Sequence, residues 1–370
     1  MNKSKISILA VADIHIEIII QNELNNMGNY MKYFRETLQK YKPDIFCIPG
    51  DFIHKSTIQA ESEEYYIATK FLENLANICR ELDIIFIIIR GTLSHDGEVV
   101  TNMIKLNKQG FARDIKYYDE MLIETIKGYN ILMLPEVTYP TLDDFNNDLN
   151  KILNGNKVDI VLFHNMFDFA IPFLKQINSE YNLGRSIVIN TVEFSKIFNI
   201  VAIGGHVHDD ISHSNIYYTG QFINQRGKIS KDKSHYGIKL FEIENNSYTY
   251  NNIVNPYYIE NVICNLDFSS IDLDKAIHIA RTYDINTTIF VLKNLKRTES
   301  TFIDFKKIIK PIYFKAVYLE ENKESNLPNE YYSTNLSTSQ DVVALLKEIY
   351  LTKYNCDIPQ YIIDSLLTNE

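Results

Sequence analysis

Five short blocks of this 370-residue sequence place aspartate and histidine directly after apolar stretches. In chain order they are Asp13-x-His15, Gly50-Asp51, His95-Asp96, His164 and Gly205-His206-x-His208. Mixed carboxylate and imidazole ligands suit Mn, Fe or Zn better than Mg or Ca. If the apolar stretches are strands of one domain whose ends meet, the pattern predicts one shared metal site.

The block with paired glycines and histidines is the most specific of the five. His206 and His208 stand two residues apart, so an extended backbone would point both imidazoles to one side. Gly204 and Gly205 allow close approach of the chain, and the combination is typical of a metal site. His164, taken alone, is more often a packed, partly buried histidine than a ligand.

The two aspartate blocks add carboxylates at other strand ends. Gly50 permits a sharp turn, after which the two oxygens of Asp51 can bridge two ions. Asp13 and His15 reach one ion together only if the backbone leaves the extended form after Asp13. His54, three residues beyond Asp51, either faces the same cleft or lies on the first turn of a helix.

Strands and helices alternate in the predicted framework that holds these blocks. Apolar stretches rich in Ile and Val predict buried strands at 6–13, 44–51, 83–90, 129–136, 158–165 and 199–206. Helical patterns lie between them at 29–40, 61–81 and 142–153. The alternation predicts an α/β domain over residues 1–252, with helices covering both faces of a sheet. Functional groups of such folds gather where strands end, which is where the five blocks stand.

Two further parts follow the predicted α/β domain. Residues 253–322 show a β-α-β-α-β pattern, which predicts a small second domain with its own sheet. Residues 323–370 begin as a polar linker and end in two short amphipathic helices. The helix pair either folds back on its own domain or docks on another protein, and the sequence favours neither.

Composition limits the partners and the compartment. A formal net charge of -10 argues against indiscriminate binding to nucleic acid, although basic residues gather between 293 and 315. Taken alone, such a run is more often a solvated face than a binding site. No apolar stretch is long enough to cross a membrane, and the four scattered cysteines are typical of free thiols in a reducing compartment. We therefore expect a cytoplasmic protein, in the host cytoplasm if it is phage-encoded.

Taken together, the ordered blocks resemble the calcineurin-like metallophosphoesterase superfamily over roughly residues 5–245. The motifs of that family are Asp-x-His, Gly-Asp, Gly-Asn-His-Asp, His and Gly-His-x-His. The resemblance implies a core of β-sheets flanked by helices, two divalent ions and hydrolysis of phosphate esters. It places Asp13, His15 and His208 on the first ion, His164 and His206 on the second, and Asp51 between them.

The third block departs from the family pattern. The segment "IIIRGTLSHDGE", residues 87–98, has Thr-Leu-Ser where the family has a single asparagine. The resemblance then implies that Ser94 stands in for the amide ligand of the second ion, unless Thr92 or a water does so. It also implies that His95 contacts the scissile phosphate and that Asp96 orients His95.

Several features resemble the DNA-repair nuclease branch, whose members include the SbcD-like nuclease subunit and the meiotic recombination nucleases. Gly-Asp51-Phe-Ile-His54 is similar to a segment whose histidine presents DNA to the metals. The resemblance implies a Mn-dependent exonuclease and endonuclease, an SbcC-like coiled-coil ATPase bound by the C-terminal helices, and a homodimer. It also places DNA-backbone contacts in the second domain, at Lys293, Lys296, Arg297, Lys306 and Lys307.

Two rival functions remain open at this point. The first is a stand-alone metal-dependent phosphatase or cyclic-nucleotide phosphodiesterase, which would leave the second domain and the helix pair without a role. The second is a non-catalytic scaffold that binds DNA or a partner, which the departure at Ser94 keeps in play.

Overall fold

The structure is a computed structural model of the chain. It describes residues 3–16, 21–54, 56–60, 62–171, 187–222, 236–257, 262–283, 288–295, 300–309 and 313–318.

A six-stranded sheet is built around the N-terminal strand. Its strand order is β14-β13-β1-β2-β3-β4. The bounds are β1 Ile6–Ala10, β2 Ile45–Pro49, β3 Ile85–Ile89, β4 Ile115–Tyr118, β13 Gly237–Glu244 and β14 Ser247–Val254. β1 to β4 are parallel, whereas β13 runs antiparallel to β1 and β14 antiparallel to β13. The carboxyl ends of β1, β2 and β3 therefore share one edge of the sheet.

A second six-stranded sheet has the order β11-β12-β10-β7-β6-β5. The bounds are β5 Leu122–Ile126, β6 Tyr129–Leu134, β7 Val158–His164, β10 Phe198–Gly205, β11 Ser212–His213 and β12 Ile216–Tyr218. β6, β7, β10 and β12 are parallel, and the edge strands β5 and β11 are antiparallel to their neighbours. A small two-stranded sheet, β8 (Met166–Phe167) with β9 (Val188–Ile189), follows β7.

The two large sheets pack against each other with helices on their outer faces, which confirms the core of β-sheets flanked by helices that the resemblance implies. Alternate residues of both sheets, such as Ile8, Ile87, Ile131 and Leu162, form one buried cluster between them. The intervening residues of each strand face helices instead. Each central strand is thus buried on both faces, which explains why these segments are continuous apolar runs.

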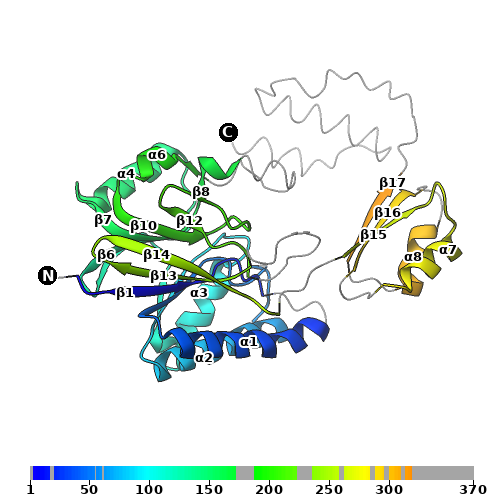
Figure 1. The fold of residues 1–370 in the computed structure, drawn as a ribbon, viewed down its shortest axis with the longest axis horizontal. Helices are drawn as coiled ribbons and strands as arrows, with labels where there is room; N and C mark the ends of the chain where they lie inside the picture. Colours follow the sequence, from blue (N-terminus) through cyan, green and yellow to red (C-terminus); the bar gives the residue numbers. More distant parts are fainter. Residues whose placement is uncertain are drawn as a thin grey trace, which may run out of the picture. The chain divides into compact units, whose positions relative to one another are not determined.

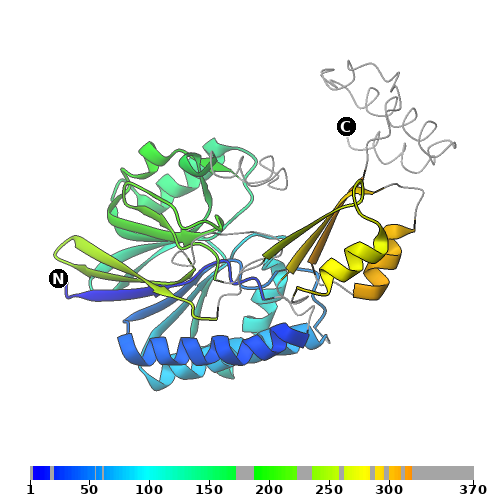
Figure 2. The same cartoon turned by 45° about the vertical axis from the view of Figure 1, so that its right-hand side comes forward.

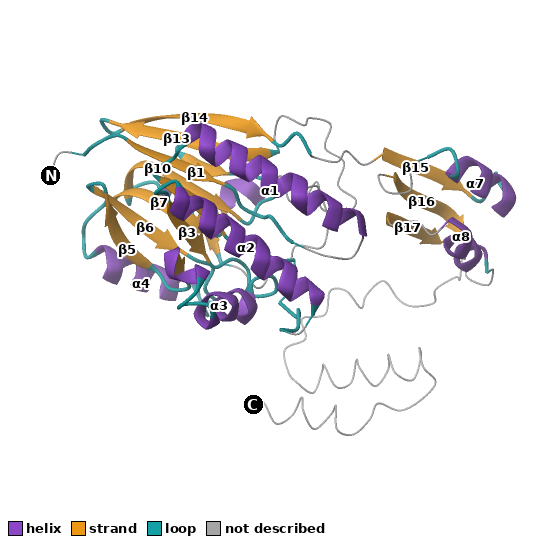
Figure 3. Ribbon diagram, turned by 90° about the horizontal axis from the view of Figure 1, so that it is seen from below, coloured by secondary structure: helices purple, strands orange, loops and turns teal. Residues whose placement is uncertain are grey.

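Helices cover the outer face of each sheet (Figures 1 and 2). α1 (Gln21–Tyr41), α2 (Glu63–Glu81) and α3 (Gly97–Leu106) pack on the first sheet, and Figure 3 shows α1 and α2 running side by side along it. α4 (Leu142–Leu153) and α6 (Thr191–Phe194) pack on the second sheet. The predicted helices at 61–81 and 142–153 start where Ser62 and Thr141 accept backbone hydrogen bonds as N-caps. α3 was not predicted from the sequence.

The predicted β-α-β-α-β pattern is present after β14. The elements are β15 Val262–Asp267, α7 Leu273–Ala280, β16 Thr288–Leu295, α8 Thr301–Ile309 and β17 Tyr313–Tyr318. The three strands form a separate sheet with its own core, which includes Leu292, Phe290 and Phe305. β14 ends at Val254, two residues beyond the predicted domain limit of 252. The limits of the three predicted domains stay predictions, and the C-terminal helix pair lies outside the described residues.

The structure also bears on the cysteines and on the apolar stretches of the sequence. Cys47, Cys79 and Cys264 are buried free thiols. None of the helices in the described part of the chain is both long enough and apolar enough to span a membrane.

Candidate metal centre

Polar side chains follow six parallel strands at the edge where the two large sheets meet. They are Asp13 after β1, Asp51 after β2, Thr92 after β3, Glu136 after β6, His164 at the end of β7 and His206 after β10. Because parallel strands direct their carboxyl ends to one edge, residues far apart in the sequence come together there. All of the sequence-predicted metal ligands except Ser94 lie with Glu136 in overlapping groups of potential metal ligands.

The first group consists of Asp13, His15 and His208. The two imidazole Nε2 atoms are 3.1 Å apart, and Oδ1 of Asp13 lies 3.8 Å from Nε2 of His15 and 3.7 Å from Nε2 of His208. Two imidazole nitrogens at this distance repel each other unless a proton or a cation lies between them. The arrangement therefore suits one divalent ion.

The second group consists of Glu136, His164 and His206. Nδ1 of His206 is 3.1 Å from Oε2 of Glu136, and Nε2 of His164 is 3.9 Å from the same oxygen. Nδ1 of His164 lies 2.8 Å from the carbonyl oxygen of Pro49, so its N–H donates there and Nε2 is left to face the centre. Such a backbone contact is the usual way in which a protein orients a metal-binding histidine.

Asp51 lies between the two groups with one oxygen toward each. Oδ1 is 3.3 Å from Nε2 of His164, and Oδ2 is 3.7 Å from Nε2 of His15. Burial alone would raise the pKa of Asp51, but His164, His15 and His95 outweigh it and hold the pKa well below its usual range. Burial likewise opposes a charge on His164, yet Asp51 and the other carboxylates raise its pKa to about 10. The buried carboxylates thus create a strong demand for positive charge.

The backbone is strained at four residues of the centre. Asp13, His15, Asp51 and His206 have φ values of 51°, 48°, 52° and 95°, a region that residues other than glycine seldom adopt. Each such residue costs roughly 1–3 kcal/mol and persists only where its surroundings enforce it. The chain does leave the extended form at Asp13, as the sharing of one ion with His15 requires. The extended backbone expected at His206 is wrong, and the turn there directs His206 and His208 to different groups.

Gly50 is a position where the centre cannot tolerate a side chain. Its φ is +88°, and a Cβ atom would lie 2.1 Å from Nδ1 of His164. Gly50→Ala is expected to lower the free energy of unfolding of the metal-free protein by about 3 kcal/mol, from overpacking and left-handed strain together. Urea unfolding measures this loss.

Gly155→Ala is the matched control for the substitution at Gly50. Gly155 has φ +75°, but nothing lies within 4 Å of the position of its Cβ. This control carries the left-handed strain without the steric contact, so it is expected to cost only about 1–2 kcal/mol. Equal losses in the two variants would contradict the close approach of Gly50 to His164.

The structure corrects the expectation for Ser94. Ser94 is exposed, and its carbonyl oxygen accepts a hydrogen bond from the backbone N–H of Ser56. The hydroxyl of Thr92 is the one that reaches the centre, 3.3 Å from Nε2 of His164 and 3.4 Å from Nδ1 of His206. The extra residues of the loop turn Ser94 outward because the chain must bend between Thr92 and His95.

Asp96 does not orient His95, contrary to the prediction. It is fully buried, and its two oxygens accept four backbone hydrogen bonds from the N–H groups of Asp51, Phe52, Ile53 and Gly91. Burial and the neighbouring charge of Asp51 raise the pKa of Asp96 to about 6, so the ionised form that accepts these bonds prevails at neutral pH. Asp96 is therefore a positioning residue for the loop that carries Asp51.

His95 and His54 lie beside the first group. The ring centroid of His95 is 4.5 Å from that of His15 and 5.6 Å from that of His54. Nδ1 of His95 makes a short contact with the carbonyl oxygen of His54, which fixes the ring. Nε2 of His95 is 4.0 Å from Oδ2 of Asp51, and the side chain is 27% exposed. His95 thus touches both the centre and the solvent.

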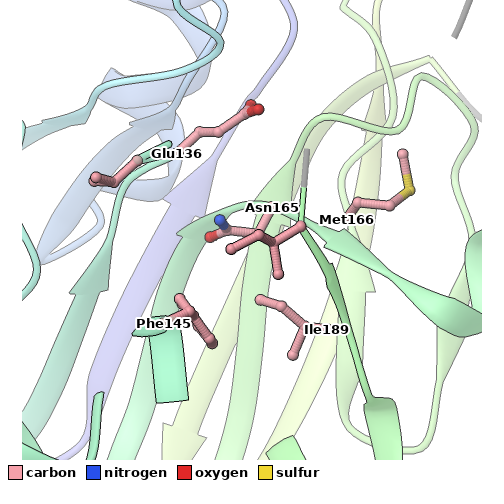
Figure 4. Close-up of a pocket in the computed structure, with 7 residues that line it drawn as sticks. Glu136, Phe145, Asn165, Met166 and Ile189 are labelled. Carbon is pink, nitrogen blue, oxygen red and sulfur yellow. The ribbon is translucent and has the colours of Figure 1, made fainter. Parts of the chain in front are cut away.

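Glu136 is the residue of the centre that the sequence analysis missed. It is the last residue of the predicted strand 129–136, so a search for acids at every strand end would have found it. It also borders a small pocket lined by Val137, Phe145, Asn165, Met166, Ile187 and Ile189. In Figure 4 the carboxylate of Glu136 points away from Phe145 and Ile189, the apolar side of that pocket.

A comparison with known families settles the class of the protein. The sequence model described as calcineurin-like phosphoesterase matches residues 6–210. The chain belongs to the calcineurin-like phosphoesterase family. In this phosphoesterase the matched residues span both ligand groups and the loop with His95, and the two sheets flanked by helices form a metallophosphoesterase core. The family is that of metal-dependent hydrolases.

Other comparisons concern individual proteins. The phosphoesterase is similar to a solved structure with a TM-score of 0.42 and 13% sequence identity. The matched region covers 67% of the phosphoesterase chain and 99% of the solved chain. The crystal structure of TT1561 of Thermus thermophilus gives 11% identity and a TM-score of 0.37, with the same coverage. Among curated proteins, none matches the chain significantly.

The donor set of the phosphoesterase fits two divalent ions. Each group offers a carboxylate oxygen and two imidazole nitrogens, and the donor atoms of a group lie within 4.8 Å of one another. Asp51 adds one oxygen on each side. Borderline divalent ions accept such mixed oxygen and nitrogen ligands.

The predicted DNA-binding residues lie far along the chain from this centre. Lys293 is on β16, and Lys306 and Lys307 are on α8, with all three side chains exposed. Lys296 and Arg297 lie outside the described residues. Contact of these residues with DNA stays a prediction.

Proposed function

We propose that the phosphoesterase is a Mn-dependent DNA nuclease that cleaves phosphodiester bonds with two ions. The observation that carries the proposal is the cluster of His15, His54 and His95 at the side of the two ligand groups. Two of these imidazoles stand beside the centre in addition to its own ligands. They can hold the phosphate and the strand that bears it.

Different side chains would bind the ions, donate a proton and position Asp51 during hydrolysis. Ions held by the two groups would lower the pKa of a water and offset negative charge on the phosphoryl oxygens. The carbonyl oxygen of His54 fixes Nδ1 of His95 and directs Nε2 toward the centre. In its doubly protonated form, His95 can donate the Nε2 proton to a phosphate oxygen or to the leaving group and becomes neutral. Asp96 keeps Asp51 in place between the groups.

A DNA substrate is favoured over a small phosphate ester by His54. The segment Gly50 to His54 resembles the nuclease branch, and the ring of His54 lies 5.5 Å from that of His15, at the side of the first group. A phosphomonoester needs only one phosphate to be held, whereas a strand has flanking phosphates that need further contacts. The exposed lysines of β16 and α8 would serve such phosphates without reading sequence.

The proposal extends to the partners implied by the same resemblance. The nuclease would act in an SbcCD-like repair or recombination complex, as a homodimer with a coiled-coil ATPase bound by the C-terminal helices. Those helices lie outside the described residues, so the partners depend on the resemblance alone.

Cleavage of end-labelled linear DNA with Mn²⁺ tests this function. We expect the full-length chain to degrade the DNA, alone or with the co-expressed ATPase, and His95→Ala to slow cleavage by about 100-fold or more, the usual contribution of a proton donor. His278→Ala is the control, because His278 is exposed on α7.

Small phosphodiesters provide the contrasting result. Rapid turnover of bis-p-nitrophenyl phosphate that DNA does not inhibit, without cleavage of DNA, would favour a stand-alone phosphodiesterase. A chain that binds Mn²⁺ and DNA but hydrolyses neither substrate would instead be a scaffold.

A further inference from the structure

We propose that Glu136 is itself a ligand of the second ion and supplies the oxygen that the loop after β3 does not. That loop, residues 91–96, carries a short hydroxyl at Thr92 and turns Ser94 outward. Without Glu136, the second group would keep two imidazoles and the shared Asp51. The inference rests on the two-ion centre of the proposed function but not on its DNA substrate.

The contacts of Glu136 place its carboxylate among the ligands of the second group. Oε2 is 3.1 Å from Nδ1 of His206, 3.9 Å from Nε2 of His164 and 2.9 Å from the hydroxyl of Thr92. The side chain is only 14% exposed. A carboxylate oxygen that faces two imidazole nitrogens is placed as a third donor to one ion.

The backbone holds Glu136 in this position. Its N–H donates to the carbonyl oxygen of Arg90 at 3.2 Å, and Nη2 of Arg90 lies 3.4 Å from the carbonyl oxygen of Glu136. Arg90 directly follows β3, which belongs to the other large sheet. The reciprocal contacts therefore tie the end of β6 to the loop that carries Thr92.

Thr92 is a support for the carboxylate. Its hydroxyl lies 2.9 Å from Oε2 of Glu136 and 3.4 Å from Oδ2 of Asp51, so its single O–H can donate to either carboxylate and is closer to Glu136. A neutral hydroxyl is a weaker ligand than a carboxylate, and the charge of Glu136 adds to the attraction for a cation. The geometry assigns the ligand role to Glu136 and an orienting role to Thr92.

Titration of the metal-free, full-length chain with Mn²⁺ tests the ligand role by stoichiometry. We expect the wild type to bind two equivalents. Glu136→Ala should lower the affinity for one of the two ions by about 100-fold or more and leave the affinity for the other unchanged. This is at least the loss seen when a residue that only hydrogen-bonds to a metal ligand is removed. Glu193→Ala is the control, because Glu193 is an exposed glutamate paired with Lys196.

Selective ¹³C labelling of glutamate carboxyls distinguishes a ligand from a residue that only orients His206. Among the described residues, the other carboxylates of the centre are the aspartates Asp13 and Asp51, so a glutamate signal reports on Glu136. In electron-nuclear double resonance of the Mn²⁺-loaded protein, we expect a through-bond ¹³C coupling in the wild type. Glu136→Gln should abolish it, because the labelled carboxylate is replaced.

Each outcome decides between the alternatives. Two bound equivalents without ¹³C coupling would overturn the ligand role of Glu136 and leave the two-ion centre standing. Unchanged binding by Glu136→Ala would overturn it as well. Fewer than two equivalents in the wild type would overturn both this role and the two-ion centre. Absence of DNA cleavage by a protein that shows two equivalents and the coupling would reject only the DNA substrate.

Discussion

Asp51→Asn is expected to reduce hydrolysis by at least about 1,000-fold, because a loss of roughly 4 kcal/mol of charge stabilisation corresponds to that factor. Asp51 is the carboxylate with one oxygen toward each ligand group. Asparagine keeps the shape, and its carbonyl oxygen can still accept the backbone N–H of Thr92, which is 2.7 Å from Oδ1. It cannot offer two charged oxygens. The steady-state rate of hydrolysis of DNA or of bis-p-nitrophenyl phosphate, whichever the wild type cleaves, measures the loss at saturating Mn²⁺.

Two controls accompany Asp51→Asn. Asp148→Asn changes an exposed aspartate that pairs with Lys151, and its rate should equal that of the wild type. Chemical unfolding of the metal-free variant should show a cooperative transition with a lower free energy of unfolding than the wild type, because asparagine lacks the attraction between Asp51 and the charged His164. A variant that is folded and still fully active would contradict the shared position of Asp51.

Asp96→Ala is expected to lower the free energy of unfolding by about 3–5 kcal/mol. Four buried N–H groups lose their acceptor, and each unsatisfied donor costs about 1–3 kcal/mol before water enters the space. Asp96→Asn should cost about half as much, because Oδ1 serves Phe52 and Ile53 while the other oxygen serves Asp51 and Gly91. Urea denaturation in the presence of a chelator measures both losses.

His95→Ala separates this positioning role from catalysis. His95 is partly exposed and its ring contacts a carbonyl oxygen, so its removal should change the free energy of unfolding by no more than about 1 kcal/mol. If Asp96 oriented His95 instead of the Asp51 loop, Asp96→Ala would retain stability and lose only activity. The free energy of unfolding of Asp96→Ala, compared with that of His95→Ala, therefore decides between the two roles of Asp96.

The strand ends were predictable because burial on both faces forces apolar runs that end abruptly in polar residues. The runs at 44–51 and 158–165 contain β2 and β7, and Asp51 and His164 follow from them directly. The small β-α-β-α-β region was also predictable, since β15 to β17 and their helices keep their own periodicities. The same alternation does not reveal how many sheets the strands form, because a buried strand looks alike between two sheets and between two helix layers.

The loops were less predictable than the strands. The motif alignment chose Ser94 as the ligand because it directly precedes His95. In the structure, the residue that reaches the centre is Thr92, which directly follows Gly91. Backbone conformation decides between the two, and it is not visible in residue types. Glu136 was not predicted for a different reason. It is a single glutamate after Pro135, and it belongs to none of the five aspartate and histidine blocks.

The ligands of the centre lie in segments from Asp13 to His208 and on both large sheets. No short peptide of the chain contains a complete set, so an unfolded or half-assembled chain has little affinity for the ions. Binding to the folded state alone adds stability that grows with ion concentration, by about 2.7 kcal/mol when the ion is present at 100 times its dissociation constant. Metal supply would then control how long the folded enzyme survives proteolysis, as well as how fast it works.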